Sequence, residues 1–196
     1  MSRKMIVLAT ICVALVLSAA ITLRSRSQEP ARASGPYITE PGGNDVISGY
    51  KHWTRVNPQP ALVLAQVAQL CASASAPPPS SPHGPDKYIT VYVNDIGRHA
   101  MMEEKTPHFP QGSIIVKEKF RKPKSTTPEL LTVMVKRERG YNPESGDWEY
   151  MIVDGNGLSV QERGKLENCQ SCHLMDKNTD YVSRNYLPVE IAKQLK

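Results

Sequence analysis

Two thiols and an imidazole stand close together near the end of the 196-residue chain, as Cys169, Cys172 and His173. A cysteine pair with this spacing and a histidine directly after it is the attachment pattern of a c-type haem. The two sulfurs can form thioether bonds to the porphyrin vinyl groups, and the adjacent imidazole can then reach the iron as an axial ligand. Chance would produce about 0.002 such matches in a chain with four Cys and five His, so we expect one covalent haem c with His173 on its iron.

Two other uses of a Cys-x-x-Cys pair stay open at this point. A structural zinc ion needs four Cys or His ligands, commonly including a second close pair. A redox-active pair is typical of a βαβ context. The remaining thiols are Cys12, inside an apolar run, and the isolated Cys71. The sequence has no second pair, and it favours haem over both alternatives.

The beginning of the chain is typical of an export signal. Basic residues at Arg3 and Lys4 precede a run from Met5 to Leu23 that contains no charged residue. This run is close to the roughly 20 residues that span a bilayer, and Arg24 follows it without a clean small-residue cleavage site. We therefore expect residues 1–27 to be either a cleaved signal peptide or a retained membrane anchor. In both cases the rest of the chain would be periplasmic, either secreted or tethered to the inner membrane.

Composition divides the remainder of the chain into a linker and one domain. Residues 28–44 are rich in Pro, Gly, Ser and Ala, which favours a flexible linker, and residues 45–196 have the length of a single domain. A second Pro- and Ser-rich stretch, residues 74–85, predicts a surface loop. The formal charge is +5, but several of the cations lie in the targeting region and no basic run is interleaved with aromatic residues. Nucleic acid is therefore not an expected partner.

From Lys87 onward, short β-branched and aromatic runs alternate with turn residues. These runs predict four strands, over Tyr88–Asn94, Ser113–Phe120, Leu130–Glu138 and Trp148–Asp154. Helices are expected over Ala61–Cys71, over Asp95–Glu104 with Asn94 as its N-cap, and around His173. The expected fold is mainly β (α+β), an antiparallel sheet with a few helices and the haem motif near the C-terminus. Small electron-transfer cytochromes c, by contrast, are all-helical.

Several segments of this half resemble the cytochrome P-460 family. They are Phe109–Glu118, Val133–Lys136, Gly146–Trp148 and Cys169–His173 with Asp180 after it, extended by Arg184 and Tyr186–Pro188. The resemblance covers about Tyr88 to Pro188, and it identifies residues 45–196 as a P-460-like haem domain. It implies an exported, mainly β, usually homodimeric c-type haem protein. The family includes hydroxylamine-oxidising enzymes and the related c′-beta cytochromes, which bind nitric oxide.

The resemblance also implies roles for individual residues. Lys117 occupies the position of a lysine that hydroxylamine-oxidising members join covalently to the porphyrin, which would distort the macrocycle and change the electronics of the iron. Phe109 occupies the position of an aromatic residue that lines the open distal side of the haem. For catalysis a nearby group must also accept protons, and Glu118 is the first candidate, beside Glu162 and Glu167.

Catalysis and plain electron transfer differ in whether the sixth position of the iron is open. Protein side chains that could close it are His99, Met101, Met102 and His108, although each also fits ordinary packing or solvent exposure. An open iron predicts binding of hydroxylamine or a small nitrogen oxide, with a hydroxylamine oxidoreductase passing electrons to a partner cytochrome. Nitric oxide binding without turnover is the main alternative, and a plain electron carrier with a methionine ligand is another.

One departure from the family pattern bears on this choice. Some active members have an arginine directly before the Thr-Val-Tyr tripeptide, whereas here Ile89 precedes Thr90–Tyr92. A polar substrate gains from polar groups near the iron. The change from arginine to isoleucine therefore predicts a less polar pocket.

Overall fold

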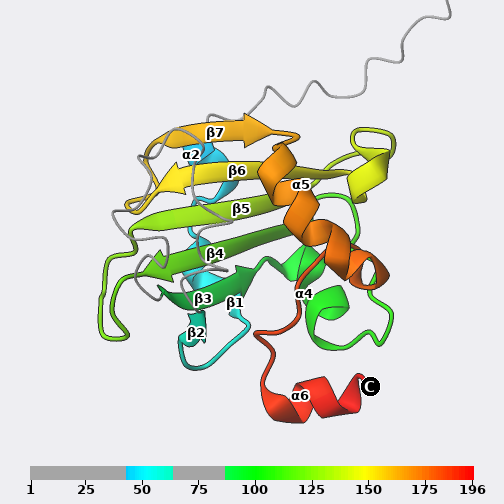
Figure 1. Ribbon diagram of the computed structural model, residues 1–196, viewed down its shortest axis with the longest axis horizontal. Coiled ribbons are helices and arrows are strands. Elements are labelled where there is room, and N and C mark those ends of the chain that lie inside the picture. The colour runs from blue at the N-terminus through cyan, green and yellow to red at the C-terminus, as the bar shows by residue number, and fades with distance from the viewer. Residues whose placement is uncertain (1–42, 64–86) are drawn as a thin grey trace, which may run out of the picture. The chain divides into compact units, whose positions relative to one another are not determined.

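The computed structural model describes residues 43–63 and 87–196, which belong to a compact unit extending from Glu40 to Lys196 (Figure 1). Within these residues no helix has the length and apolar character needed to cross a membrane. The expected signal or anchor, and the expected loop over 74–85, lie outside the described residues. Most of the expected linker does too, but its last two residues, Gly43 and Asn44, begin a helix.

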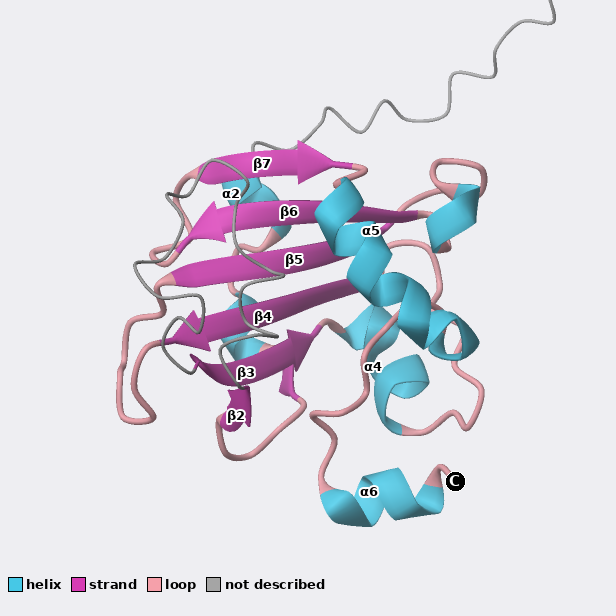
Figure 2. Ribbon diagram, in the orientation of Figure 1, coloured by secondary structure: helices cyan, strands magenta, loops and turns pink. Residues whose placement is uncertain are grey.

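In the described residues the centre of the fold is an antiparallel sheet of seven strands, shown in Figure 2. The strands are β1 (Thr54–Arg55), β2 (Ala61–Val63), β3 (Lys87–Val93), β4 (Ile114–Phe120), β5 (Leu130–Lys136), β6 (Trp148–Asp154) and β7 (Val160–Gly164). Their order is β1-β3-β4-β5-β6-β7, with β2 also pairing with β3, and every pairing is antiparallel. The mainly β class is confirmed, and so are the four expected strands, β3 to β6.

Short helices surround the sheet. They are α2 (Gly43–Val46), η1 (Tyr50–His52), α4 (Asp95–Met102), η2 (Pro143–Ser145), α5 (Glu167–His173), η3 (Leu174–Thr179) and α6 (Val189–Gln194). The helix expected after Asn94 is confirmed as α4, and the Asn94 side chain caps it by accepting the Gly97 N–H at 3.1 Å. The helix expected around His173 is confirmed as α5.

The helix expected over Ala61–Cys71 is wrong at its beginning. Ala61–Val63 form β2 and pair with β3, where Ala61 lies opposite Ile89. Hydrogen bonding to a neighbouring strand outweighs a short helical spacing of apolar residues, because backbone preferences are weak beside tertiary contacts. The remainder of this segment lies outside the described residues.

The two faces of the sheet carry different cores. Helices α5 and η3 cross one face and α2 and η1 lie on the other, so we call them the α5 face and the α2 face (Figure 1). Side chains alternate along each strand, and the α5 face receives Val91, Ile115, Met134, Trp148 and Tyr150. The α2 face receives Val116, Leu131, Val133, Met151 and Val153, which pack with Ile47 and Tyr50. Because side chains alternate between the two faces, only every second residue of a strand projects toward the haem motif on α5.

Candidate functional site

A cavity lies between α5 and the α5 face of the sheet, and Cys169, Cys172 and His173 all border it. Together with adjoining open solvent it holds about 620 Å³ of empty space. Most of its wall is apolar, and besides the haem motif the polar side chains that border it are Lys117, Thr132, Tyr150, Ser183 and Tyr186. The wall is therefore suited to an apolar group with a few polar anchors.

The two thiols fit covalent attachment of such a group. Cys169 and Cys172 are three residues apart on α5, so both side chains lie on the same side of the helix. Each is half-buried, borders the cavity and stands as a thiol, without a disulfide between them. Thiols held in this way can form the two thioether bonds of a haem c.

The alternatives left open by the sequence find no support in the described part of the chain. No cluster of three or more His, Cys, Asp or Glu side chains suited to a metal ion occurs there. The sheet that the structure describes is antiparallel at every pairing, so it offers no βαβ unit of the kind that carries a thioredoxin-like pair. Neither a zinc site nor a redox-active pair is indicated.

His173 is held as the neutral tautomer that can bind a metal through one ring nitrogen. Its Nδ1 lies 2.7 Å from the backbone oxygen of Tyr181, and because a carbonyl only accepts, Nδ1 carries the hydrogen and donates it. This leaves Nε2 as the nitrogen that can bind iron. Burial, and next the positive charge of Lys117, lower the pKa of His173 to about 4, although the bond to Tyr181 opposes the shift. The imidazole is therefore neutral at neutral pH.

The carbonyl that orients His173 belongs to an unusual turn. Asp180 and Tyr181 both have left-handed backbones, with φ of 52° and 63°. The Asp180 carboxylate accepts two hydrogen bonds from Lys136 Nζ, at 2.8 and 2.6 Å, and one from the Phe109 N–H at 2.8 Å. Trp148 Nε1 donates to the backbone oxygen of Asp180 at 2.7 Å. From the sequence, Asp180 was expected only as part of the family pattern, and nothing indicated that Lys136 is its partner.

Lys117 lies in the same cavity as the haem motif. It projects from β4 onto the α5 face, where its cross-strand neighbours are Val91 and Thr132. Its Nζ lies 5.8 Å from the centroid of the Tyr186 ring. Its charge also acts on the pKa of His173. The structure thus brings together four of the expected site residues, namely Cys169, Cys172, His173 and Lys117.

Glu118 and Phe109 lie elsewhere. Glu118 follows Lys117 in the strand and so projects to the α2 face, where it is 3% exposed and accepts a hydrogen bond of 2.7 Å from the Tyr50 hydroxyl. Phe109 is fully buried in the core against Trp148, with ring centroids 5.5 Å apart. Neither residue borders the cavity in the structure as described. The expected proton acceptor and distal aromatic residue are thus not placed there.

The other expected carboxylates do not border the cavity either. Glu162 on β7 lies opposite Ile152, which puts it on the α5 face but away from the cavity wall. Glu167 is exposed at the beginning of α5. Among the described residues that line the cavity there is no carboxylate at all. Ile89 is buried in the core and does not border the cavity, so the less polar pocket expected from it stays a prediction.

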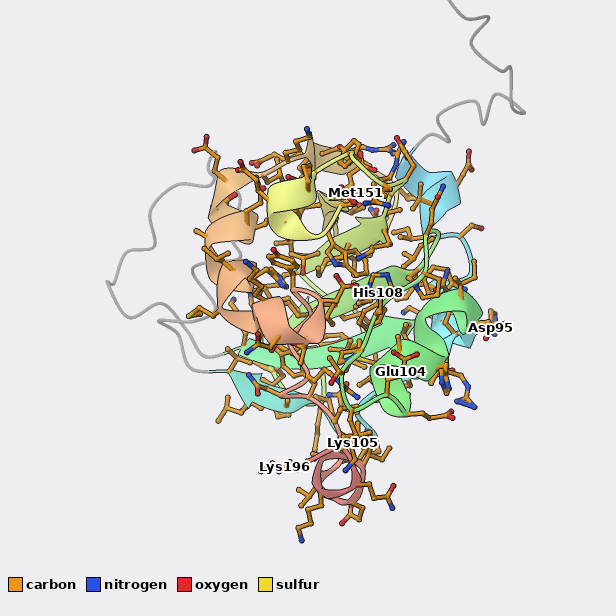
Figure 3. The ribbon with its side chains drawn as sticks, turned by 90° about the vertical axis from the view of Figure 1, so that its right-hand side faces the viewer. Asp95, Glu104, Lys105, His108, Met151 and Lys196 are labelled. Carbon is orange, nitrogen blue, oxygen red and sulfur yellow. The ribbon has the colours of Figure 1, made fainter. Side chains whose placement is uncertain are left out.

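The four expected closing ligands, all within the described residues, lie away from the cavity. His99 and His108 are exposed, and Figure 3 shows His108 on the segment after α4, at the end of the molecule turned to the viewer. Met101 is buried in the core of the α5 face and Met102 packs against it. Of the two methionines that border the cavity, neither singled out from the sequence, Met134 lies in the core of the α5 face, whereas the side chain of Met151 packs into the core of the α2 face. The alternation along β5 could have placed Met134 on the same face as Lys117.

Comparison with known proteins adds one finding. A family model described as Cytochrome P460 matches residues 48–184, a range that contains the sheet, α5 and every residue given above for the cavity except Tyr186. Among curated proteins no match was found.

Proposed function

The chain belongs to the cytochrome P460 family, whose members are haem-binding cytochromes, and from this premise we propose that it is exported and carries a single haem c. Cys169 and Cys172 would hold the porphyrin and His173 would bind the iron. The observation that carries this proposal is the meeting of both thiols and the neutral imidazole at one largely apolar cavity. Export to the periplasm, a redox partner cytochrome and a homodimer are parts of the same proposal.

A haem iron bound here supplies redox chemistry and a coordination position for a small ligand. We propose hydroxylamine as the substrate, with nitric oxide as a related ligand of the same position. The chain's own residues would hold and tune the site. His173 donates to the Tyr181 carbonyl and keeps a fixed orientation, apolar walls limit the entry of water, and Lys117, which borders the same cavity, would form a third covalent link to the porphyrin edge.

The test of haem attachment uses the full chain, produced in a host that exports it and matures c-type haem. The wild-type protein is expected to keep its haem under denaturing conditions, because thioether bonds survive unfolding. The double variant Cys169→Ser, Cys172→Ser should lose covalent haem, whereas Cys71→Ser serves as a control for the loss of a thiol and should keep it. A colourless wild-type protein, or covalent pigment in the double variant, would refute the proposal.

Nitric oxide binding without turnover is a second candidate, and one observation favours it. No carboxylate is found among the described residues that line the cavity, so a ready acceptor for the protons of hydroxylamine is not in place. One assay distinguishes the two proposed functions: hydroxylamine and an artificial electron acceptor are added to the purified protein. Reduction of the acceptor supports the oxidoreductase. Avid nitric oxide binding with no reduction supports the second candidate.

A further inference from the structure

We propose that the buried ion pair of Lys136 and Asp180 is a positioning device for the iron ligand. It would hold the turn at Asp180 and Tyr181 so that the Tyr181 carbonyl accepts the hydrogen of His173 Nδ1. The inference rests on the proposed function, because it requires His173 to bind iron. It adds two residues to the site that do not border the cavity.

The contacts of Asp180 come from three separate parts of the fold. Lys136, at the end of β5, reaches both carboxylate oxygens, and their side chains are only 8% and 10% exposed. Phe109, on the segment before β4, donates its backbone N–H to Oδ2. Trp148, at the beginning of β6, donates its ring N–H to the backbone oxygen. A residue held from three sides cannot move without breaking several buried polar contacts.

The backbone at this point needs such restraint. Two consecutive residues other than glycine, Asp180 and Tyr181, have positive φ values, a conformation that persists only where the surroundings impose it. Packing closes the turn from another side as well. A Cβ added to Gly146 would lie 2.6 Å from the Tyr181 ring and 2.9 Å from the Asp180 carboxylate. The turn is therefore fixed by charge pairing and by close packing together.

A single hydrogen bond, from His173 Nδ1 to the Tyr181 carbonyl, connects the turn to the proposed iron ligand. A carbonyl that accepts from Nδ1 fixes the ring orientation and makes Nε2 more basic, which strengthens its bond to oxidised iron. If the ion pair is lost, the Tyr181 carbonyl is no longer held against His173 and this bond weakens. The expected consequence is a higher haem reduction potential, since the oxidised state loses the stronger ligand.

The experiment measures the haem reduction potential of the full-length, haem-loaded protein. Asp180→Asn removes the carboxylate charge, and asparagine tolerates the left-handed backbone. Lys136→Met removes the positive charge that pairs with Asp180 and keeps a side chain of similar length. If the pair acts only as two charges, the variants should shift the potential in opposite directions, upward for Asp180→Asn and downward for Lys136→Met. If the pair positions the carbonyl, both should shift it upward, and Lys136→Arg should return it toward the wild-type value.

Glu149→Gln is the matched control. Glu149 is also buried on this sheet and also accepts hydrogen bonds from basic side chains, but these belong to Arg137 and Arg163 and not to the turn. This variant should lose stability with no change in potential. If Lys136→Met leaves the potential unchanged or lowers it, the inference is overturned, even if the protein is less stable. If Asp180→Asn does not fold, Lys136→Met alone decides the matter.

The inference and the proposed function can fail separately. A wild-type protein that carries no covalent haem refutes the proposed function, and the inference falls with it. A wild-type protein that carries haem, with variants whose potentials stay unchanged or move in opposite directions, refutes the inference alone.

Discussion

The ring of Tyr150 packs against the ring of His173, with their centroids 5.5 Å apart. The Tyr150 hydroxyl shares a buried hydrogen bond of 2.8 Å with Ser145, and burial raises the pKa of this phenol to about 12. Tyr150 also borders the cavity. It therefore acts as a neutral wall that supports the imidazole from the side, in addition to the hydrogen bond that His173 makes to Tyr181.

The Tyr150 wall can be tested by separating its ring from its hydroxyl. Tyr150→Phe keeps the ring and should cost roughly 1 kcal/mol of unfolding free energy, the usual value of one hydrogen bond, with an unchanged haem spectrum. Tyr150→Ala should cost roughly 3–5 kcal/mol, as expected for removal of a large buried ring, and should alter the spectrum. Urea unfolding and absorption spectra measure both. Equal spectra for wild type and Tyr150→Ala would show that the ring does not support His173.

The proposed link of Lys117 to the porphyrin predicts a change in chemistry. Lys117→Leu should keep haem through the two thioether bonds but release it intact when those bonds are cleaved chemically, whereas the wild-type haem should stay attached. The ferrous absorption of the variant should move to that of an ordinary c-type haem. Mass spectrometry of the cleaved protein gives the answer. Lys119→Leu removes a lysine two residues along the same strand and should behave as wild type. Release of haem from the wild-type protein would exclude the link.

An open iron predicts that Met134, the methionine that borders the cavity from the α5 face, does not bind it. Met134→Leu conserves apolar volume, so it should cost less than about 1.5 kcal/mol and leave the absorption spectrum of the oxidised protein unchanged, as should Met151→Leu, a control on the α2 face. Loss of a methionine-to-iron band in Met134→Leu would instead identify a closed iron and a plain electron carrier. The comparison requires only the purified oxidised proteins.

The ion pairs of Glu149 predict how stability depends on pH. Burial alone raises the pKa of this carboxyl, but hydrogen bonds from Arg163 and Arg137 outweigh it and hold the pKa below the ordinary 4.5. A carboxyl whose pKa is lower in the folded state contributes stability above pH 4.5 and loses that contribution as the pH falls through the folded value. Glu149→Gln should therefore destabilise the protein at pH 7 by roughly 3 kcal/mol, and the difference should shrink below pH 4.5. Urea unfolding from pH 3 to 7 measures it, and a constant difference would contradict the assignment.

The elements carrying the strongest local signals were predictable from sequence. Trp148–Asp154 forms β6 as expected, because its β-branched and aromatic residues suit a strand buried on both faces. Asn94 caps α4 through a short-range contact that spacing alone reveals. The strand Val160–Gly164 was missed, because its polar middle and terminal glycine give no clear alternation.

The candidate site was predictable only in part, for a related reason. Cys169, Cys172 and His173 form a local motif, so their chemistry can be inferred without the fold. Lys136 and Asp180 are 44 residues apart, and only the folded chain brings them into contact. Glu118 was expected near the iron because it neighbours Lys117 in sequence, yet neighbours in a strand face opposite sides.

Because Lys117 and Glu118 face opposite sides of the sheet, the site is sensitive to any one-residue shift along β4. Deleting a single residue of β4 ahead of this pair would exchange the amine at the cavity for a carboxylate and bury the amine among the apolar side chains below Tyr50. Substitutions elsewhere in β4 would leave this arrangement in place. Changes in length should therefore be tolerated in the turns on either side of β4, but not between Ile114 and Glu118.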